Sequence, residues 1–144
     1  MSAVYLDTSV LAKWYLPEPR SDEAAAFIEA RAPAVVSTLS VVELRSLLSR
    51  RRRAGQLDAL EESKVFATFE EDAAAGHVAL RAVPDAALRA AVTLIARLPD
   101  HPLRTLDALH LAMVLREDCT ELATADRVMA AAAEALGLVV HRFD

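Results

Sequence analysis

The sequence predicts an α/β fold, a three-layer sandwich in which helices flank a central, mostly parallel sheet. Short apolar runs, partly β-branched, alternate with longer runs of helix-forming residues along the whole chain. That alternation is typical of strands and helices that form a layered α/β structure. The connections are short, and the chain contains only 3 Gly and 6 Pro, which leaves little room for flexible linkers. A length of 144 residues suits one domain, which we place at 1–144.

The first half of the chain is predicted to hold two strands and four helices. The strands are apolar and partly β-branched, whereas the helices are rich in Ala, Leu and Glu. Pro17 and Pro19 end the first helix, because proline cannot continue its hydrogen bonds. Gly55 ends the third helix, and Asp58 with Glu61 fits a capping pattern at the start of the fourth. The strands are residues 3–6 and 34–38, and the helices are 8–16, 21–31, 40–55 and 58–76.

The second half repeats the alternation with three strands and three helices. Pro84 opens the first of these helices, a position that suits proline because its missing N–H needs no partner there. Two further prolines, Pro99 and Pro102, indicate a loop before the next helix. The strands are residues 77–83, 121–124 and 138–143, and the helices are 84–98, 105–118 and 125–137.

Composition and charge narrow the class of protein. A hydrophobic fraction of 54% with 26% charged residues indicates a globular chain rather than a disordered one. The formal net charge of −5 argues against binding nucleic acid by bulk electrostatics. A nucleic-acid function must therefore rest on a local patch or on a metal. The run Arg50–Arg53 is one such patch, although cations also suit a solvated helix C-terminus.

Two features of the sequence indicate where in the cell the protein is expected. The only cysteine, Cys119, cannot form an internal disulfide, which is consistent with a reducing compartment, and we expect the protein to be cytoplasmic. The N-terminus has no basic region ahead of its apolar residues, and no run approaches the roughly 20 apolar residues that span a bilayer. We therefore expect neither a signal peptide nor a membrane partner.

Four acids fall at positions where an α/β sheet builds its binding site. Asp7 follows the first strand, Asp126 follows the fourth, and Glu43 and Asp107 lie near the starts of helices. In parallel sheets, ligands bind at the carboxyl ends of strands where the strand order reverses. If these carboxylates converge, they repel one another, and a divalent cation relieves that repulsion. Oxygen ligands favour Mg²⁺ or Mn²⁺ over zinc.

Each acid also has a purely structural alternative. Asp7 can cap the helix that begins at the next residue. Glu43 follows Ser40 by three positions, which fits a capping box. Asp107 lies in a first helical turn, where negative charge suits the helix dipole, and Asp126 can be an N-cap. The hypothesis of a shared site therefore depends on the four acids together.

Four stretches resemble the PIN-domain family, and within it the VapC-type toxin ribonucleases. They occur in the family's order and cover most of the chain, whereas residues 61–96 contribute little to the resemblance. The stretches are VYLDTSVL (4–11), STLSVVELRSLL (37–48), RTLDALHLAMV (104–114) and LATADRVMAAAAEALGL (122–138).

The resemblance implies a PIN-like fold and an Mg²⁺- or Mn²⁺-dependent ribonuclease that cleaves RNA phosphodiester bonds. Residue by residue, the family's acids fall on Asp7, Glu43, Asp107 and Asp126, which are thus implied to bind the metal and to be catalytic. Such proteins dimerise and are neutralised by a VapB-like antitoxin, so RNA, an antitoxin and a second copy are the implied partners.

Several neighbouring residues have open roles. Thr8, Ser9 and Thr124 are candidates for a hydroxyl at the site. His110, one turn after Asp107, has three interpretations: packing at the core edge, a hydrogen bond to a carboxylate, or a general base.

The aromatic end of the first helix is also open to two interpretations. Trp14 and Tyr15 are of the kind common in interfaces. Packing into the core is the alternative.

Two other functions compete with a ribonuclease. Asp7 at a strand end could instead accept a phosphoryl group, as in haloacid-dehalogenase-like phosphatases or receiver domains. The phosphatases usually carry a second Asp two positions later, where this chain has Ser9. The chain could also be a non-catalytic binding module, which would show no Mg²⁺-dependent cleavage.

Overall fold

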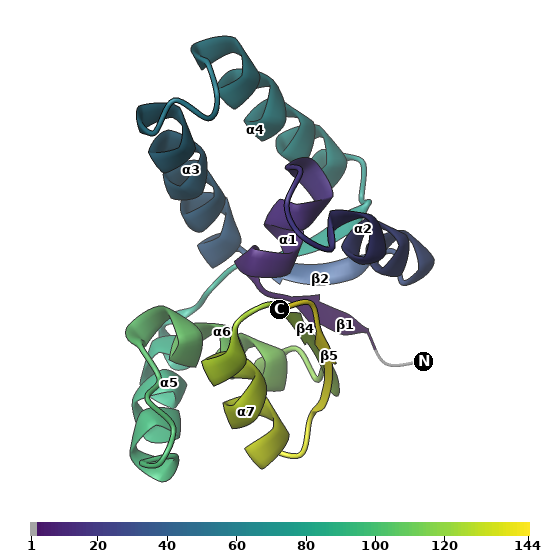
Figure 1. Cartoon of the computed structure of the whole chain (residues 1–144). Coiled ribbons are helices and arrows are strands. Elements are labelled where there is room, and N and C mark those ends of the chain that lie inside the picture. The colour runs from purple at the N-terminus through teal and green to yellow at the C-terminus, as the bar shows by residue number, and fades with distance from the viewer. Residues whose placement is uncertain (1–2) are drawn as a thin grey trace.

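The computed structural model describes residues 3–144, in which five parallel strands form one sheet between two layers of helices (Figure 1). The strand order is β3-β2-β1-β4-β5, and every neighbouring pair is parallel. The predicted three-layer α/β class is therefore confirmed. The strands are β1 (Val4–Leu6), β2 (Ala34–Ser37), β3 (Val78–Arg81), β4 (Glu121–Thr124) and β5 (Val139–Arg142).

Seven helices of the described chain cover the two faces of the sheet. Figure 1 shows α1 to α4 on one side and α5 to α7 on the other, with α3 and α4 reaching away from the sheet as a hairpin. The helices are α1 (Thr8–Tyr15), α2 (Ser21–Ala30), α3 (Thr38–Arg53), α4 (Ala59–Ala74), α5 (Asp85–Arg97), α6 (Thr105–Arg116) and α7 (Arg127–Ala135).

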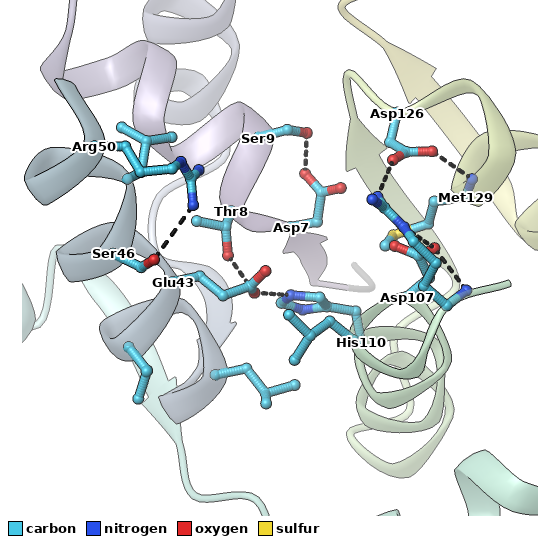
Figure 2. A pocket seen from close by; sticks show the side chains of 15 residues that line it. Asp7, Thr8, Ser9, Glu43, Ser46, Arg50, Asp107, His110, Asp126 and Met129 are labelled. Atoms are coloured by element: carbon cyan, nitrogen blue, oxygen red, sulfur yellow. Dashed lines mark hydrogen bonds and ion pairs between the residues drawn. The ribbon is translucent and has the colours of Figure 1, made fainter. Parts of the chain in front are cut away.

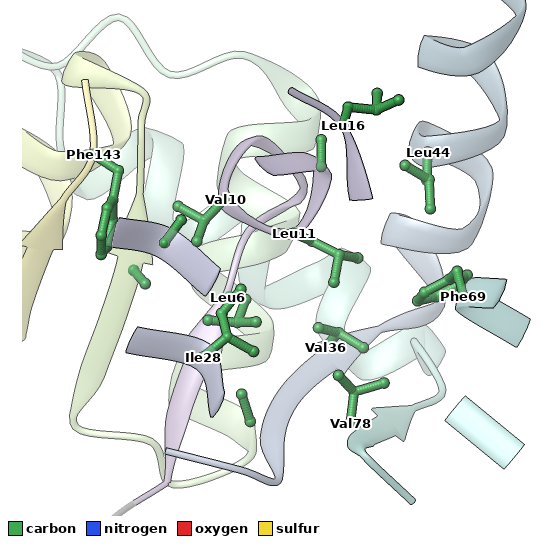
Figure 3. Close-up of a cluster of buried hydrophobic side chains, with 14 of the residues drawn as sticks. Leu6, Val10, Leu11, Leu16, Ile28, Val36, Leu44, Phe69, Val78 and Phe143 are labelled. Carbon is green, nitrogen blue, oxygen red and sulfur yellow. The ribbon is translucent and has the colours of Figure 1, made fainter. Parts of the chain in front are cut away.

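One apolar cluster holds α1 to α4 against the sheet (Figure 3). Because successive strand residues point to opposite faces, β1 sends Val4 and Leu6 to this side. Trp14 and Tyr15 are half-buried and pack against the same cluster, so core packing accounts for this aromatic pair. The fully buried helical members include Val10, Leu11, Ile28, Leu44, Leu48 and Phe69.

A second apolar cluster holds α5 to α7 against the other face. Tyr5 and Leu122 point to this side from β1 and β4. Helix α6 is buried along almost its whole length, from Asp107 to Val114. A helix enclosed on all sides needs apolar residues nearly all round, and LDALHLAMV supplies them apart from Asp107 and His110.

The strand order fixes where a site can form. The chain adds β2 and β3 on one side of β1 and then returns to place β4 on the other side, so the order reverses at β1. The backbone N–H of Asp7 donates to the carbonyl oxygen of Ala123 at 3.2 Å, which ties the end of β1 to the end of β4. Crevices at such reversals are the usual ligand sites of open α/β sheets.

Most predicted elements are confirmed, with one informative difference. We predicted that the third helix starts at Ser40, whereas α3 starts at Thr38 and follows β2 directly. Asp58 and Glu61 form the predicted capping box of α4. Within residues 3–144, no helix combines the length and apolar character needed to cross a membrane.

Candidate active site

A pocket of about 470 Å³ opens at the carboxyl ends of β1 and β4. All four predicted acids line it: Asp7 after β1, Glu43 from α3, Asp107 from α6, and Asp126 before α7 (Figure 2). Segments far apart in the chain thus bring four carboxylates to one place, as the strand-end pattern predicted.

Asp7 lies deepest and is held by three donors. Its Oδ1 accepts from the Ser9 hydroxyl at 2.5 Å and from the Val10 backbone N–H at 3.3 Å, and its Oδ2 accepts from the Thr124 hydroxyl at 2.6 Å. The residue is only 3% exposed. Burial raises the pKa of Asp7, while the charge of His110 and the two hydroxyl groups oppose that rise. Asp7 is therefore the N-cap of α1 and also a carboxylate of the pocket.

The same hydroxyls reach the loop after β4. The backbone N–H of Ala125 donates to the Ser9 Oγ at 2.9 Å, and that of Asp126 donates to the Thr124 Oγ1 at 2.9 Å. Ser9 and Thr124, two of the hydroxyl candidates, therefore connect Asp7 to the loop that carries Asp126. Both hydroxyls orient the carboxylate of Asp7; Ser9 also lines the pocket, whereas Thr124 is fully buried.

Glu43 is held from two sides. Its Oε1 accepts from the Thr8 hydroxyl at 2.8 Å and bonds to the His110 Nε2 at 2.5 Å. Burial acts to raise the pKa of Glu43, but the hydrogen bond and charge of His110 and the hydroxyl of Thr8 together lower it. The capping-box alternative is wrong: α3 has no side-chain cap bond, and the Ser40 hydroxyl instead lies 2.9 Å from that of Thr8.

His110 links Glu43 to the core of the sheet. Its Nδ1 lies 2.7 Å from the Tyr5 hydroxyl, which also donates to the Ser37 Oγ at 2.9 Å. Tyr5, Ser37 and His110 are all 2% exposed or less, and burial raises the pKa of Tyr5. Of the three interpretations of His110, the structure supports the hydrogen bond to a carboxylate. We call Ser37, Tyr5, His110 and Glu43 the buried chain.

Asp107 and Asp126 lie on the opposite wall and share one arginine. Asp107 Oδ2 accepts from the backbone N–H of Arg104 at 3.0 Å, and Asp126 Oδ1 accepts from that of Met129 at 2.9 Å. Both acids therefore serve helix N-termini, as their structural alternatives proposed. The Arg104 guanidinium also lies 3.4 Å from Asp107 Oδ2 and 3.4 Å from Asp126 Oδ2.

The donor chemistry of the pocket fits a hard divalent cation. Among residues 3–144, no three acidic, histidine or cysteine side chains are grouped closely enough to hold a metal by themselves. However, Mg²⁺ usually keeps several waters and takes one or two protein carboxylates together with substrate phosphates. The carboxylates available are those of Asp7, Asp107 and Asp126, and the position between the last two already attracts a cationic group, the guanidinium of Arg104.

Known proteins resemble this chain in sequence and in fold. The profile described as PIN domain matches residues 4–135. Ribonuclease VapC46 of Mycobacterium tuberculosis is 34% identical over 146 residues, which cover 97% of each chain.

The chain belongs to the PIN-domain family.

Solved structures have the same fold. The crystal structure of Mycobacterium tuberculosis VapC20, described as a sarcin-ricin loop cleaving toxin, aligns with a TM-score of 0.74 at 18% identity, covering 97% of this chain and 99% of that one. VapBC2 from Rickettsia felis, bound to a DNA fragment from its promoter, aligns with a TM-score of 0.70 at 12% identity over 99% of each chain. PIN-domain ribonucleases generally depend on a divalent metal.

Three arginines of the run Arg50–Arg53 in this PIN domain fall into two groups. Arg50 is exposed and lines the pocket from α3. Arg51 pairs with Glu18, and Arg52 lies 3.5 Å from the buried Glu62. The charges of Arg51 and Arg52 are therefore paired with acids outside the pocket, whereas Arg50 presents its charge to a ligand that enters the pocket.

Two residues that contact side chains of the PIN-domain pocket were not among the predicted site residues: Arg104, which lines the pocket, and the buried Tyr5. Arg104 lies three positions before Asp107, a spacing that places the two on one side of a first helical turn. That spacing was a usable signal. Tyr5 sits inside an apolar strand and contacts His110, 105 positions away. No local pattern reveals a pair so distant in the chain.

Proposed function

We propose that this PIN-domain protein is an Mg²⁺- or Mn²⁺-dependent ribonuclease and the toxin of a toxin–antitoxin pair. One observation carries the proposal: Asp7, Glu43, Asp107 and Asp126 line a single pocket at the point where the strand order reverses. The 34% identity to Ribonuclease VapC46 supports RNA as the substrate class.

The residues of the pocket have different proposed roles in the reaction. Asp7, Asp107 and Asp126 would hold the metal, and Glu43 would hold and orient the attacking water from the facing wall. A bound divalent cation supplies an activated water and neutralises charge that develops on the phosphate. Ser9 and Thr124 keep both oxygens of Asp7 hydrogen-bonded and so fix its orientation, which is the usual task of groups behind a ligand.

Substrate positioning falls to the arginine at the rim. Arg50 stands on α3 with its side chain toward the pocket and a contact of 3.2 Å to the Ser46 hydroxyl. Arginine contacts RNA phosphates without reading the base sequence. With a net charge of −5, the chain relies on such local positive charge and on the metal to attract RNA.

Sequence comparison favours cleavage over phosphoryl transfer to Asp7. The 34% identity to Ribonuclease VapC46 supports cleavage, and Ser9 stands where haloacid-dehalogenase-like phosphatases usually carry a second Asp. The alternative, a non-catalytic binding module, would show no Mg²⁺-dependent cleavage of RNA.

An antitoxin has a suitable surface beside the pocket. A groove of about 450 Å³ runs between α3 and α4 and is lined by Val41, Val42, Arg45, Ser46, Ser49 and Phe66. Val42 is 71% exposed, and both Val42 and Ser46 also line the active pocket. An apolar segment seated in this groove would lead directly to the acids, and neighbours of this fold include toxin–antitoxin complexes.

A second copy would cover the apolar side of α5. Leu88, Val92 and Ile95 are 43–70% exposed on that helix, and their spacing puts them on one face. We propose this face as the homodimer contact.

The decisive experiment measures Mg²⁺-dependent cleavage of total cellular RNA by purified, antitoxin-free protein. We expect cleavage that EDTA abolishes and that Asp7→Asn reduces more than about 100-fold, given that even groups behind a metal ligand contribute 10–100-fold. Asparagine caps a helix about as well as aspartate, so the fold should survive. Cleavage that persists in Asp7→Asn, or its absence from the wild type, would refute the proposal.

A further inference from the structure

The guanidinium of Arg104 contacts the carboxylates of two proposed metal ligands, Asp107 and Asp126. Its guanidinium lies 3.4 Å from Asp107 Oδ2 and 3.4 Å from Asp126 Oδ2, on the wall of the pocket formed by α6 and α7. Its side chain forms ion pairs with these two acids, and its charge also acts on Glu43 across the pocket. A single positive charge therefore sits between two negative ones where a cation is expected.

We propose that Arg104 is a displaceable counter-ion, which neutralises Asp107 and Asp126 until a divalent cation takes its place. The inference rests on the proposed function, because it assumes that the two acids hold the metal. It adds that metal binding is a competition with the protein's own side chain.

The geometry indicates that the side chain can leave easily. It is 79% exposed, and both contacts exceed the 2.7–3.2 Å typical of N–H···O hydrogen bonds. Exposed ion pairs of this kind are weak. A cation with two charges, bound by the same oxygens in a partly buried pocket, has the advantage over such a guanidinium.

The two acids do not need the guanidinium to keep their places. The backbone N–H of Arg104 fixes Asp107 at 3.0 Å, and the backbone N–H of Met129 fixes Asp126 at 2.9 Å. Those bonds survive any substitution of the Arg104 side chain except proline. Removing the guanidinium therefore removes charge from the wall without displacing the carboxylates.

A second arginine serves as a matched control. Arg127 is 81% exposed and directly follows Asp126 in sequence, but its side chain pairs with Asp144 and does not line the pocket. Arg104→Gln and Arg127→Gln thus each remove one exposed positive charge near Asp126. Of the two arginines, Arg104 alone pairs with Asp107 and Asp126, so only its removal should make Mn²⁺ binding tighter.

The test is Mn²⁺ binding by isothermal titration to protein stripped with EDTA, in the absence of RNA. Because an exposed ion pair contributes about 0.2–1 kcal/mol, we expect Arg104→Gln to bind Mn²⁺ about 1.4- to 5-fold more tightly than the wild type. Arg104→Lys keeps the charge and should lie near the wild type, and Arg127→Gln should match the wild type. The rise in melting temperature on adding Mn²⁺ should be largest for Arg104→Gln.

The outcomes separate this inference from the proposed function. If the wild type binds Mn²⁺ and Arg104→Gln binds it no more tightly, the counter-ion role is refuted while the metal site stands. Equal tightening by Arg104→Gln and Arg127→Gln also refutes it, since general charge would then be the cause. If no variant binds Mn²⁺, both this inference and the metal site fail. Circular dichroism of each variant confirms that the fold is retained.

Discussion

The two walls of the pocket hold their acids by different means. On the α3 wall, Glu43 belongs to the buried chain, whose hydrogen bonds of 2.5–2.9 Å run from Ser37 to the pocket. On the opposite wall, Asp107 and Asp126 are fixed by helix N-termini and share one exposed arginine at 3.4 Å.

We therefore call the α3 wall, which carries Glu43, the rigid wall, and the wall that carries Asp107 and Asp126 the adjustable wall. Buried polar groups interact strongly, and leaving one without a partner is costly, so the position of Glu43 is coupled to the stability of the fold. The acids of the other wall use bonds that asparagine can largely replace, and their charge is balanced by a side chain in solvent. Substitutions on the adjustable wall should therefore affect chemistry alone, whereas those on the rigid wall should affect chemistry and stability together.

Among the changes that compare the two walls, Asp126→Asn is expected to have the largest effect on cleavage. Asparagine keeps the bond from Met129 and should change the free energy of unfolding by only a few tenths of a kcal/mol, while cleavage falls by about 100-fold or more. Glu43→Gln is the matched change on the rigid wall and should lower both cleavage and stability, because Gln cannot replace the carboxylate beside His110. Urea unfolding and an RNA cleavage assay measure the two quantities. A marked loss of stability in Asp126→Asn would contradict the comparison.

A smaller effect on cleavage is expected when the hydroxyl of Tyr5, which bonds to His110 within the buried chain, is removed. Tyr5→Phe leaves the Nδ1 of His110 and the hydroxyl of Ser37 short of a buried partner, which costs about 1–3 kcal/mol, and cleavage should fall roughly tenfold. Tyr15→Phe is the control, since its hydroxyl donates to Asp72 at 2.7 Å outside the pocket. It should lose stability without losing turnover in folded protein. Equal turnover in the two variants would show that the buried chain serves folding only.

The smallest effect is a difference in pH dependence, measured in EDTA. The pKa of Asp7 is raised, so its ionised form destabilises the fold at neutral pH, and that cost disappears as pH falls through the raised pKa. The pKa of Glu43 is lowered, so its contribution is present above the usual Glu pKa of about 4.3 and is lost as pH falls through the lowered value. Asp7→Asn should therefore be more stable than the wild type at pH 7 and Glu43→Gln less stable, with both differences closing in acid. Urea titrations from neutral to acidic pH measure this, and differences of the same sign would contradict it.

Much of the fold followed from local sequence. Pro17 and Pro19 ended the first helix and Pro84 opened another as predicted, because proline acts on its own backbone and its nearest neighbours. The start of α3 was misplaced by two residues, since Ser40 looked like a cap while the structure uses it to contact Thr8. A serine's partner decides its role, and here that partner lies 32 positions away.

The candidate site, like the fold, was predictable from the sequence only in part. The sequence by itself determined that Asp7 and Asp126 follow strands and that their carboxylates meet at one edge, because parallel strands end on the same side of a sheet. The cytoplasmic location and the extent of the domain stay predictions, as do the catalytic and metal-binding roles of the four acids.

Only the tertiary structure decided what holds those acids. The contacts from Tyr5 to His110, from His110 to Glu43, and from Arg104 to Asp126 span 105, 67 and 22 positions. Such contacts depend on how β1, α3, α6 and α7 pack, and packing is set by the whole core rather than by neighbours in the chain. Local propensity specifies most element boundaries, although not the start of α3, and the energies of burial and of long-range hydrogen bonds decide which side chains face each other.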